Sequence, residues 1–268
     1  MLEEVYHDLP GAVKTLPFQL HMRPKRLQRI DYSAPMPAPA YEISWFGDRC
    51  LRICFGNQNT SETRALVFSA FQMIDEADVE GCFSATPAYT TLHVRFDPLA
   101  VREPERIIRS ILDSPYTRPS KREFNLIEIP VCYETEFAPD LASVAAHAGL
   151  SPAEVVRLHS SAAYEVAFVG FTPGFGYLTG LPAELAAPRL PSPRTRVPPG
   201  SVGIAGDQTG IYPSATPGGW RLIGRTPLRM FDATRAEPSL LSIGNGVRFR
   251  PIGRAEFESI QRTIEGSA

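Results

Sequence analysis

The residues best suited to chemistry lie in the second half of the chain, between Gly170 and Asp232. The arginines of this stretch can bind a carboxylate or phosphate in a bidentate manner, and the turns of this stretch carry amide, hydroxyl and carboxylate groups. Glycines there let the backbone approach a ligand, and prolines fix the shape of the loops. We predict catalytic roles for Asp207 and Tyr212, and substrate-binding roles for Arg189, Arg194, Arg196, Gln208, Thr209, Phe175 and Tyr177.

A structural interpretation of the same stretch stays open beside the functional one. Glycine and proline are normal at the corners of a β-barrel, and a single arginine is commonly a solvated or ion-paired surface group. Asp207 lies in the sequence GDQTG between two predicted strands, where an aspartate also serves as a turn former. The residue types therefore fit both a binding site and a set of tight turns.

The residue types that the second half lacks narrow its chemistry. No lysine follows Lys121, no cysteine follows Cys132 and no histidine follows His159. This half therefore holds no Walker A loop, no lysine Schiff base and no Cys–His pair, and a Ser–His–Asp triad would need His159. Carboxylates such as Asp207 and the tyrosines remain as proton carriers. Such a half fits an incomplete site that another protein completes.

The composition is that of a soluble globular protein with a real core. The chain has 268 residues, of which 43% are hydrophobic and 21% charged, a length that favours two domains. A net charge of −2 gives no basis for binding nucleic acid or an anionic membrane. The acidic N-terminus lacks the pattern of a signal peptide, and no run of 18 apolar residues occurs, so we expect a cytoplasmic protein.

Cysteine and histidine form no metal-binding motif in the sequence. Four cysteines occur without a CxxC pair, and five histidines are scattered along the chain. We expect reduced core thiols and no metal site.

The chain divides into three predicted regions. Residues 1–40 are a proline-rich extension that ends in the linker-like SAPMPAPA. Residues 41–135 are predicted as a small α/β domain, an open sheet with helices packed on one face. Its expected strands span 41–46, 51–55, 81–87, 91–96 and 124–133, and its expected helices span 61–77 and 104–112.

Residues 136–268 are predicted as a β-barrel domain with leading linker helices. Asp140 can cap the first helix, and Ser151 with Glu154 forms a capping box on the second. From residue 164 to about residue 252, short apolar runs alternate with glycine and proline, which is typical of a closed barrel. A closing helix is expected at 256–264. The fold class is therefore α+β.

Three strings in the barrel half carry a family resemblance: GFTPGFGYL, PRLPSPRTRVPPGSVGIAGDQTGIYP and PGGWRLIGRTPLRMFD. Together they resemble the family of KipI, the B subunit of 5-oxoprolinase and allophanate hydrolase subunit 1. The similarity extends upstream through GDRCLRICFG and PAYTTLHVRFDP, and covers residues 41–252. The resemblance implies a small α/β N-terminal domain followed by a cyclophilin-like β-barrel domain.

The resemblance also implies a function and partners. It points to the B subunit of an ATP-dependent 5-oxoprolinase, which converts 5-oxo-L-proline, ATP and water to L-glutamate. Such a chain is active only with a larger homologous partner, either KipA or the C subunit of 5-oxoprolinase, and the A subunit of 5-oxoprolinase is the third component. ATP is then a cofactor of the complex. Two alternatives stay open: a KipI-like inhibitor of a sensor histidine kinase, and a component of a biotin-dependent urea carboxyltransferase or allophanate hydrolase system.

The sequence departs from the family pattern at a few positions. Asp207 stands where the family usually has an amide, which adds a negative charge to the predicted site. Gly176 replaces a usual proline, and Glu134–Thr135 replaces a pair of glycines. These differences bear on the ligand more than on the fold.

Overall fold

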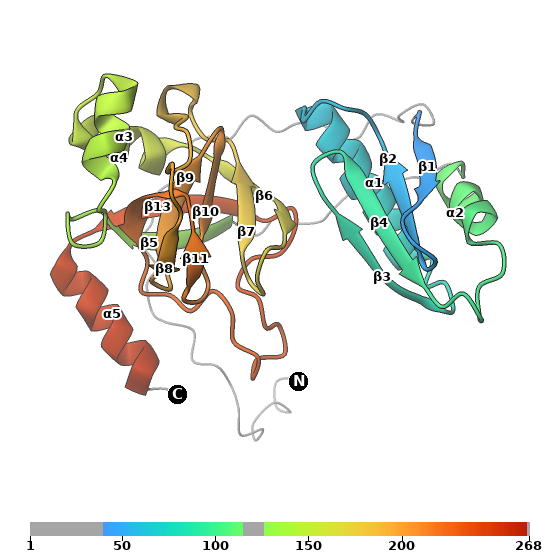
Figure 1. Ribbon diagram of the computed structural model, residues 1–268. Helices are drawn as coiled ribbons and strands as arrows, with labels where there is room; N and C mark the ends of the chain where they lie inside the picture. Colours follow the sequence, from blue (N-terminus) through green and yellow to red (C-terminus); the bar gives the residue numbers. More distant parts are fainter. Residues whose placement is uncertain (1–39, 115–125, 267–268) are drawn as a thin grey trace, which may run out of the picture. The chain divides into compact units, whose positions relative to one another are not determined.

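The protein is described by a computed structural model that covers residues 40–114 and 126–266. These residues form an open sheet with two helices and a closed β-barrel with further helices (Figure 1). The α+β fold class predicted from the sequence is confirmed. The predicted extension lies outside the described residues except for residue 40. Within the described ranges, no helix has the length and apolar character needed to cross a membrane.

The open sheet is antiparallel throughout and has the strand order β1-β2-β4-β3. Both of its helices pack on one face, where alternate strand residues such as Leu51, Ile53, Leu92 and Val94 are buried against them. The elements are β1 (Glu42–Trp45), β2 (Cys50–Cys54), α1 (Ser61–Glu76), β3 (Cys82–Pro87), β4 (Thr91–Phe96) and α2 (Pro104–Leu112). These bounds confirm the predicted strands and helices to within two residues.

The barrel closes in the strand order β10-β7-β6-β13-β5-β12-β9. Its strands are β5 (Leu126–Cys132), β6 (Tyr164–Val169), β7 (Gly176–Thr179), β9 (Ser201–Ala205), β10 (Gln208–Ile211), β12 (Arg221–Arg225) and β13 (Gly246–Ile252). Two further strands, β8 (Arg194–Val197) and β11 (Thr216–Gly218), form a small separate sheet.

Strand β5 corrects one expectation. The sequence placed it in the open sheet, but it pairs in parallel with β13 along all seven of its residues and closes the barrel. Ile129 and Val131 point into the barrel core, where both side chains are fully buried. The pairing partner lies more than a hundred residues away in the sequence, and no local pattern specifies it.

Three α-helices and a short 3-10 helix accompany the barrel: α3 (Leu141–Ala148), α4 (Pro152–Ser161), η1 (Ala183–Leu185) and α5 (Arg254–Gly266). The predicted capping box on α4 is confirmed. Ser151 Oγ accepts from the backbone N–H of Glu154, and the Glu154 carboxylate accepts from the backbone N–H of Ser151 at 3.0 Å. Helix α5 is fixed to the barrel by Phe257, whose ring lies 4.5 Å from that of Phe137.

Helix α4 carries His159 into the barrel interior, where the imidazole is fully buried. The ring stacks on Phe249 with centroids 4.5 Å apart. Thr209 Oγ1 donates to the carbonyl of Gly203, so it accepts from His159 Nε2 at 3.2 Å. Tyr133 Oη then donates to His159 Nδ1 at 2.9 Å. The imidazole is therefore neutral, and burial lowers its pKa to about 3.

This buried imidazole should make folding stability depend on pH. In the unfolded chain His159 takes up a proton below about pH 6.5, whereas in the folded chain it stays neutral until far lower pH. The contribution of the neutral His159 to the free energy of unfolding is fully present above about pH 6.5. It is lost at up to about 1.4 kcal/mol per pH unit as the pH falls toward 4. Urea unfolding of the wild-type chain at several pH values measures this slope.

The matched variants are His159→Gln, which removes the buried titrating group, and His147→Gln, which removes an exposed histidine of α3. The first should flatten the pH dependence between 6.5 and 4, although it lowers stability overall. The second should leave the slope as it is in the wild type. Parallel curves for the wild type and His159→Gln would contradict the assignment.

Candidate functional site

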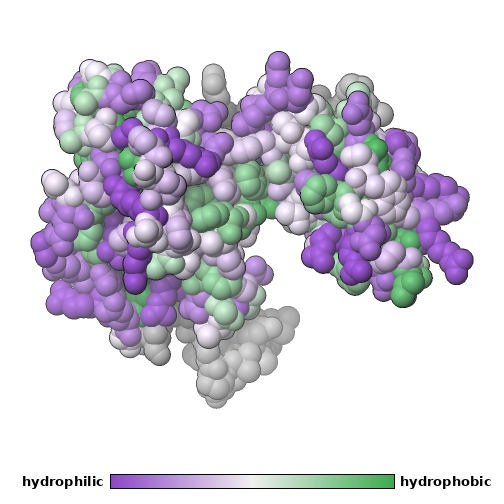
Figure 2. Space-filling view, viewed as in Figure 1, coloured by the Kyte–Doolittle hydropathy of each residue, from purple (hydrophilic) through white to green (hydrophobic). Residues whose placement is uncertain are grey.

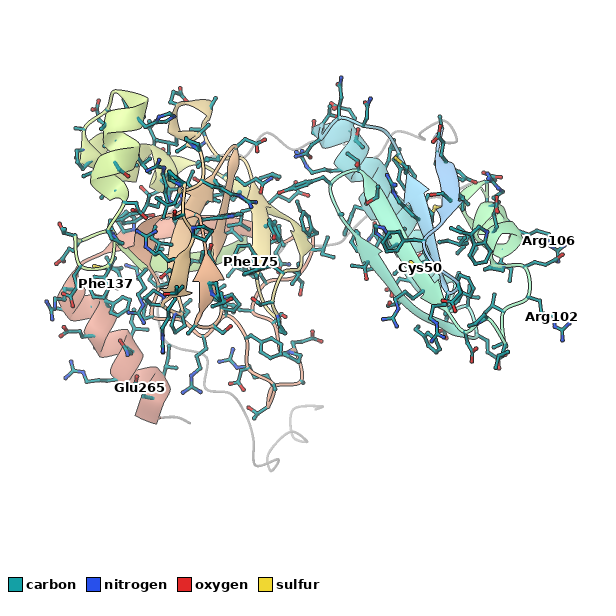
Figure 3. All side chains as sticks on the ribbon, in the orientation of Figure 1. Cys50, Arg102, Arg106, Phe137, Phe175 and Glu265 are labelled. Carbon is teal, nitrogen blue, oxygen red and sulfur yellow. The ribbon has the colours of Figure 1, made fainter. Side chains whose placement is uncertain are left out.

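A layer of aromatic rings covers the outer side of the barrel strands in the stretch that the sequence singled out. Phe175, Tyr212 and Trp220 form its buried part, with 1%, 2% and 5% of each residue exposed. Phe175 stands edge-to-face to both others, with ring centroids 5.3 Å from Tyr212 and 5.4 Å from Trp220. Tyr177 completes the layer at its partly buried edge. Phe175 is the residue immediately before β7 (Figure 3).

Strand alternation places these rings outside the barrel. Leu178 packs in the barrel interior, so its neighbour Tyr177 points to the outer side. In β10, Ile211 likewise points inward and the next residue, Tyr212, outward. Val197 of β8 is buried in the same layer, so the rings hold the small β8–β11 sheet against the barrel.

Glycines supply the space that the rings need. A Cβ atom at Gly210 would lie 3.0 Å from the Phe175 ring, and one at Gly218 would lie 2.5 Å from Tyr212 Oη. Any larger residue at Gly218 would displace the phenol. The glycines of this stretch therefore seat aromatic side chains, which is the structural role that the sequence left open for them.

One exposed cation, Arg189, lies near the phenols of this layer. Burial raises the pKa of Tyr177 and of Tyr212, and in both cases the charge of Arg189 opposes the rise; a backbone hydrogen bond from Trp220 also opposes it at Tyr212. The segment is anchored by a hydrogen bond from the backbone N–H of Leu190 to the carbonyl of Gly219. No carboxylate among the described residues pairs with Arg189, so its guanidinium is open to an anion.

The two residues predicted to be catalytic do not meet. Asp207 lies exposed at the tip of the β9–β10 hairpin, beside Gly206 with its φ of +60°. Tyr212 follows the other end of β10, five residues away, which is about 17 Å along an extended strand. Gln208 is at the Asp207 end as well. Asp207 and Gln208 therefore belong to the hairpin turn, whose neighbour Ala205 is buried in the aromatic layer and whose Gly206 is bridged to Ala187 in the segment that carries Arg189.

Three other predicted site residues turn inward or lie buried. Thr209 is fully buried, and its hydroxyl is used by Gly203 and His159, so no ligand reaches it from the outer face. Phe175 and Tyr212 have almost no exposed surface and form the floor of the aromatic layer. Among the predicted substrate-binding residues, the structure brings Arg189 and Tyr177 together with open surface.

Arg194 has a structural partner that the sequence did not reveal. Its Nη2 donates to Asp140 Oδ1 at 2.8 Å, while Asp140 Oδ2 accepts from the backbone N–H of Leu222 at 2.7 Å. Asp140 was expected to cap α3, but its side chain makes no capping hydrogen bond there, because both carboxylate oxygens are already used. Arg194 Nη1 is buried without a partner among the described residues. Arg196, two residues along β8, is exposed.

Sequence reasoning also missed Phe171 and Trp220. Phe171 has a φ of +67°, a backbone conformation that is rare for an aromatic residue and that its residue type does not predict. Trp220 follows the glycine pair in PGGW, and that pair was a usable signal that a large ring packs closely against the backbone.

Comparison with known proteins identifies relatives over most of the chain. Residues 41–241 match the family model of the carboxyltransferase domain, subdomain C and D. The chain is 40% identical over 230 residues to the B subunit of 5-oxoprolinase from Bacillus subtilis (strain 168), which covers 82% of this chain and 96% of that protein. It is 48% identical over 182 residues to the B subunit of 5-oxoprolinase from Escherichia coli O157:H7, covering 68% of this chain and 82% of that one.

A solved structure gives the same picture for the fold. The crystal structure of TTHA0988 superimposes with a TM-score of 0.69 and 36% sequence identity. The match covers 76% of this chain but 40% of the TTHA0988 chain, so the fold described above forms one part of a longer chain in that protein.

The Asp140–Arg194 ion pair yields a prediction about stability. Arg194→Met should lower the free energy of unfolding by about 3 kcal/mol, because it leaves the Asp140 carboxylate buried without its counter-charge. Arg196→Met changes the same residue type on the same strand at an exposed position, and should cost less than about 0.5 kcal/mol. Urea unfolding followed by far-UV circular dichroism measures both. Equal losses in the two variants would contradict the structural role of Arg194.

Proposed function

The chain belongs to the family of 5-oxoprolinase B subunits, which carries carboxyltransferase subdomains C and D, and from this we propose that it is the B subunit of an ATP-dependent 5-oxoprolinase. The observation that carries the proposal is the 40% identity to the Bacillus subtilis protein across 96% of its length. In the proposed reaction, water is added across the lactam C–N bond of 5-oxo-L-proline, which yields the side-chain carboxylate and free amine of L-glutamate, and ATP is hydrolysed.

We infer that the chain supplies half of the active site. Arg189 offers a bidentate partner for the substrate carboxylate, with the phenol of Tyr177 beside it. Burial raises the pKa of both tyrosines in the layer, so at neutral pH they are hydrogen-bond donors and not bases. His159 is inside the barrel, and Asp207 is at the end of β10 opposite Tyr212. We assign the general base and the ATP site to the partner proteins, the larger of which corresponds to KipA or the C subunit of 5-oxoprolinase.

The proposal is tested by reconstitution. The isolated chain should show negligible 5-oxoproline-dependent ATP hydrolysis, and the three-component complex with the larger subunit should show full activity, since only the complex contains a base and an ATP site. Glutamate formation and ADP release are measured together. Full activity of the isolated chain would overturn the half-site. A complex that is inactive toward 5-oxoproline but carboxylates urea, or a chain that inhibits a sensor histidine kinase, would overturn the proposed reaction.

A second experiment addresses Arg189. Arg189→Lys keeps the charge but removes the fork of donors, and should lower kcat/KM for 5-oxoproline at least about tenfold, mainly through KM, because a bidentate contact is lost. Arg106→Lys is the control, because Arg106 is an exposed arginine on α2 of the open sheet, and it should change kcat/KM less than about twofold. Steady-state kinetics of the reconstituted complex measure both. An unchanged KM in Arg189→Lys would remove Arg189 from the substrate site.

A further inference from the structure

The open sheet has one face on which neither of its helices packs. Alternate residues of β2 and β4 are buried against α1 and α2, so the residues between them point to the opposite face. Hydrophilic residues cover much of the visible surface of the protein (Figure 2), but on this face the strand register fixes where each polar group lies. Three of the residues on it are basic: Arg52, His93 and Arg95.

The strand register brings these three basic side chains together. Arg52 lies directly opposite His93, and Arg95 follows His93 by two residues on the same face of β4. Cross-strand partners have Cβ atoms about 5 Å apart, and residues two apart on one strand are separated by about 7 Å. Both arginines are exposed and the histidine is partly exposed. The Arg52–His93–Arg95 cluster is therefore compact enough to contact a single bound ion.

Carboxylates do not balance the positive charge of this cluster. Neither arginine forms an ion pair within the described ranges. Glu42 is the one acidic residue in strands β1 to β4, and it lies opposite Cys54, diagonal to Arg52. Like charges directly opposite one another on a sheet are destabilising. An anion bound at this face would supply the negative charge that the sheet lacks.

Hydroxyl groups and an aromatic ring surround the cluster. The ring of Phe46 is edge-on to the imidazole of His93 at 5.6 Å, and Phe46 is 64% exposed. The residues opposite the cations on the two outer strands all carry hydroxyl groups: Ser44, Ser84 and Thr86. This face offers more donors than the two oxygens of a carboxylate can use, and their number suits the three terminal oxygens of a phosphate group.

We infer that this face of the open sheet binds a dianionic phosphate group, free or carried by a small molecule, among Arg52, His93 and Arg95. The forked donors of arginine match the oxygens of a phosphate in a way that lysine does not. Phe46 gives the group that carries the phosphate a flat apolar neighbour. The inference is independent of the proposed function, because none of these residues belongs to the barrel.

Protonation of His93 should couple binding to pH. Burial lowers the pKa of His93, and the charge of Arg52 lowers it further, so the free imidazole is neutral near pH 8. A bound dianion favours the imidazolium, so binding takes up a proton and becomes tighter as the pH falls. Arginine stays charged throughout. The remaining titratable groups of this face are the carboxylate of Glu42 and the thiols of Cys50 and Cys54, and burial raises the pKa of Cys50 against the opposing charge of the neighbouring arginine.

The first test is a titration of the full chain with inorganic phosphate at constant ionic strength, followed by calorimetry. Arg95→Gln removes one guanidinium from the cluster, whereas Arg106→Gln removes an exposed arginine of α2. Arg95→Gln should weaken phosphate binding about tenfold, and Arg106→Gln less than about twofold. Circular dichroism should show that both variants keep the fold. Equal affinity of the wild type and Arg95→Gln, or no saturable binding by the wild type, would overturn the site.

The second test uses sulfate, which keeps its two charges between about pH 6 and pH 8 and so isolates the histidine. The wild type should bind sulfate about fivefold more tightly at the lower pH, and His93→Gln should bind it equally at both. A pH dependence that persists in His93→Gln would refute the role of the imidazole and with it the site.

The third test identifies the source of the phosphate. AMP should bind more tightly than inorganic phosphate, and Phe46→Ser should remove the difference, if a small molecule carries the group; equal binding of the two ligands by the wild type identifies free phosphate at the same site. Hexaglutamate serves as the alternative ligand. Saturable binding of hexaglutamate without binding of phosphate would show that the face docks an acidic protein segment, and the inference would be wrong.

Discussion

The carboxylate of Asp140 is the interaction on which the outer part of the barrel depends. It joins three segments that are distant in sequence, because one oxygen accepts from Arg194 of β8 and the other from the backbone of Leu222 in β12, while Asp140 itself precedes α3. The side chain of Asp140 is 10% exposed and that of Arg194 is 28% exposed, so the pair is largely shielded from solvent. Without it, the small β8–β11 sheet would lose its polar link to the barrel wall, and the aromatic layer beneath would lose part of its cover.

The aromatic layer then decides which groups remain available for recognition. The rings of this layer pack against outward-facing glycines and are almost completely buried, so their role is structural; they are Phe175, Tyr212 and Trp220. The groups left at the surface are Arg189, the edge of Tyr177 and the ring of Phe171. These are the groups through which the layer can meet a ligand.

Local patterns predicted the elements well and their assembly less well. Helix α2 and strand β4 were predicted to the residue, because proline and apolar periodicity mark them clearly. Strand β5 was assigned to the wrong sheet, since its parallel pairing with β13 is set by contacts distant in sequence. Thr209 was predicted to bind substrate, but the alternation of side chains along β10 turns it into the barrel, where it is fully buried. Asp207 and Tyr212 were predicted as proton carriers from their residue types, which do not reveal that the extended strand β10 holds them apart.

The distribution of proton-transfer groups bears on the proposed need for a partner protein. The barrel's histidine is held neutral inside by Tyr133 and Thr209, with a pKa lowered to about 3, and so cannot accept a proton near neutral pH. The tyrosines of the outer layer are held as donors by burial. Neither His159 nor these tyrosines can therefore take a proton from water near neutral pH. The carboxyl of Glu165 on β6, whose pKa is raised by burial, and the exposed carboxylate of Asp207 are the acidic groups that this wall of the barrel keeps. The base that we assign to a second chain would supply what the histidine and the tyrosines cannot.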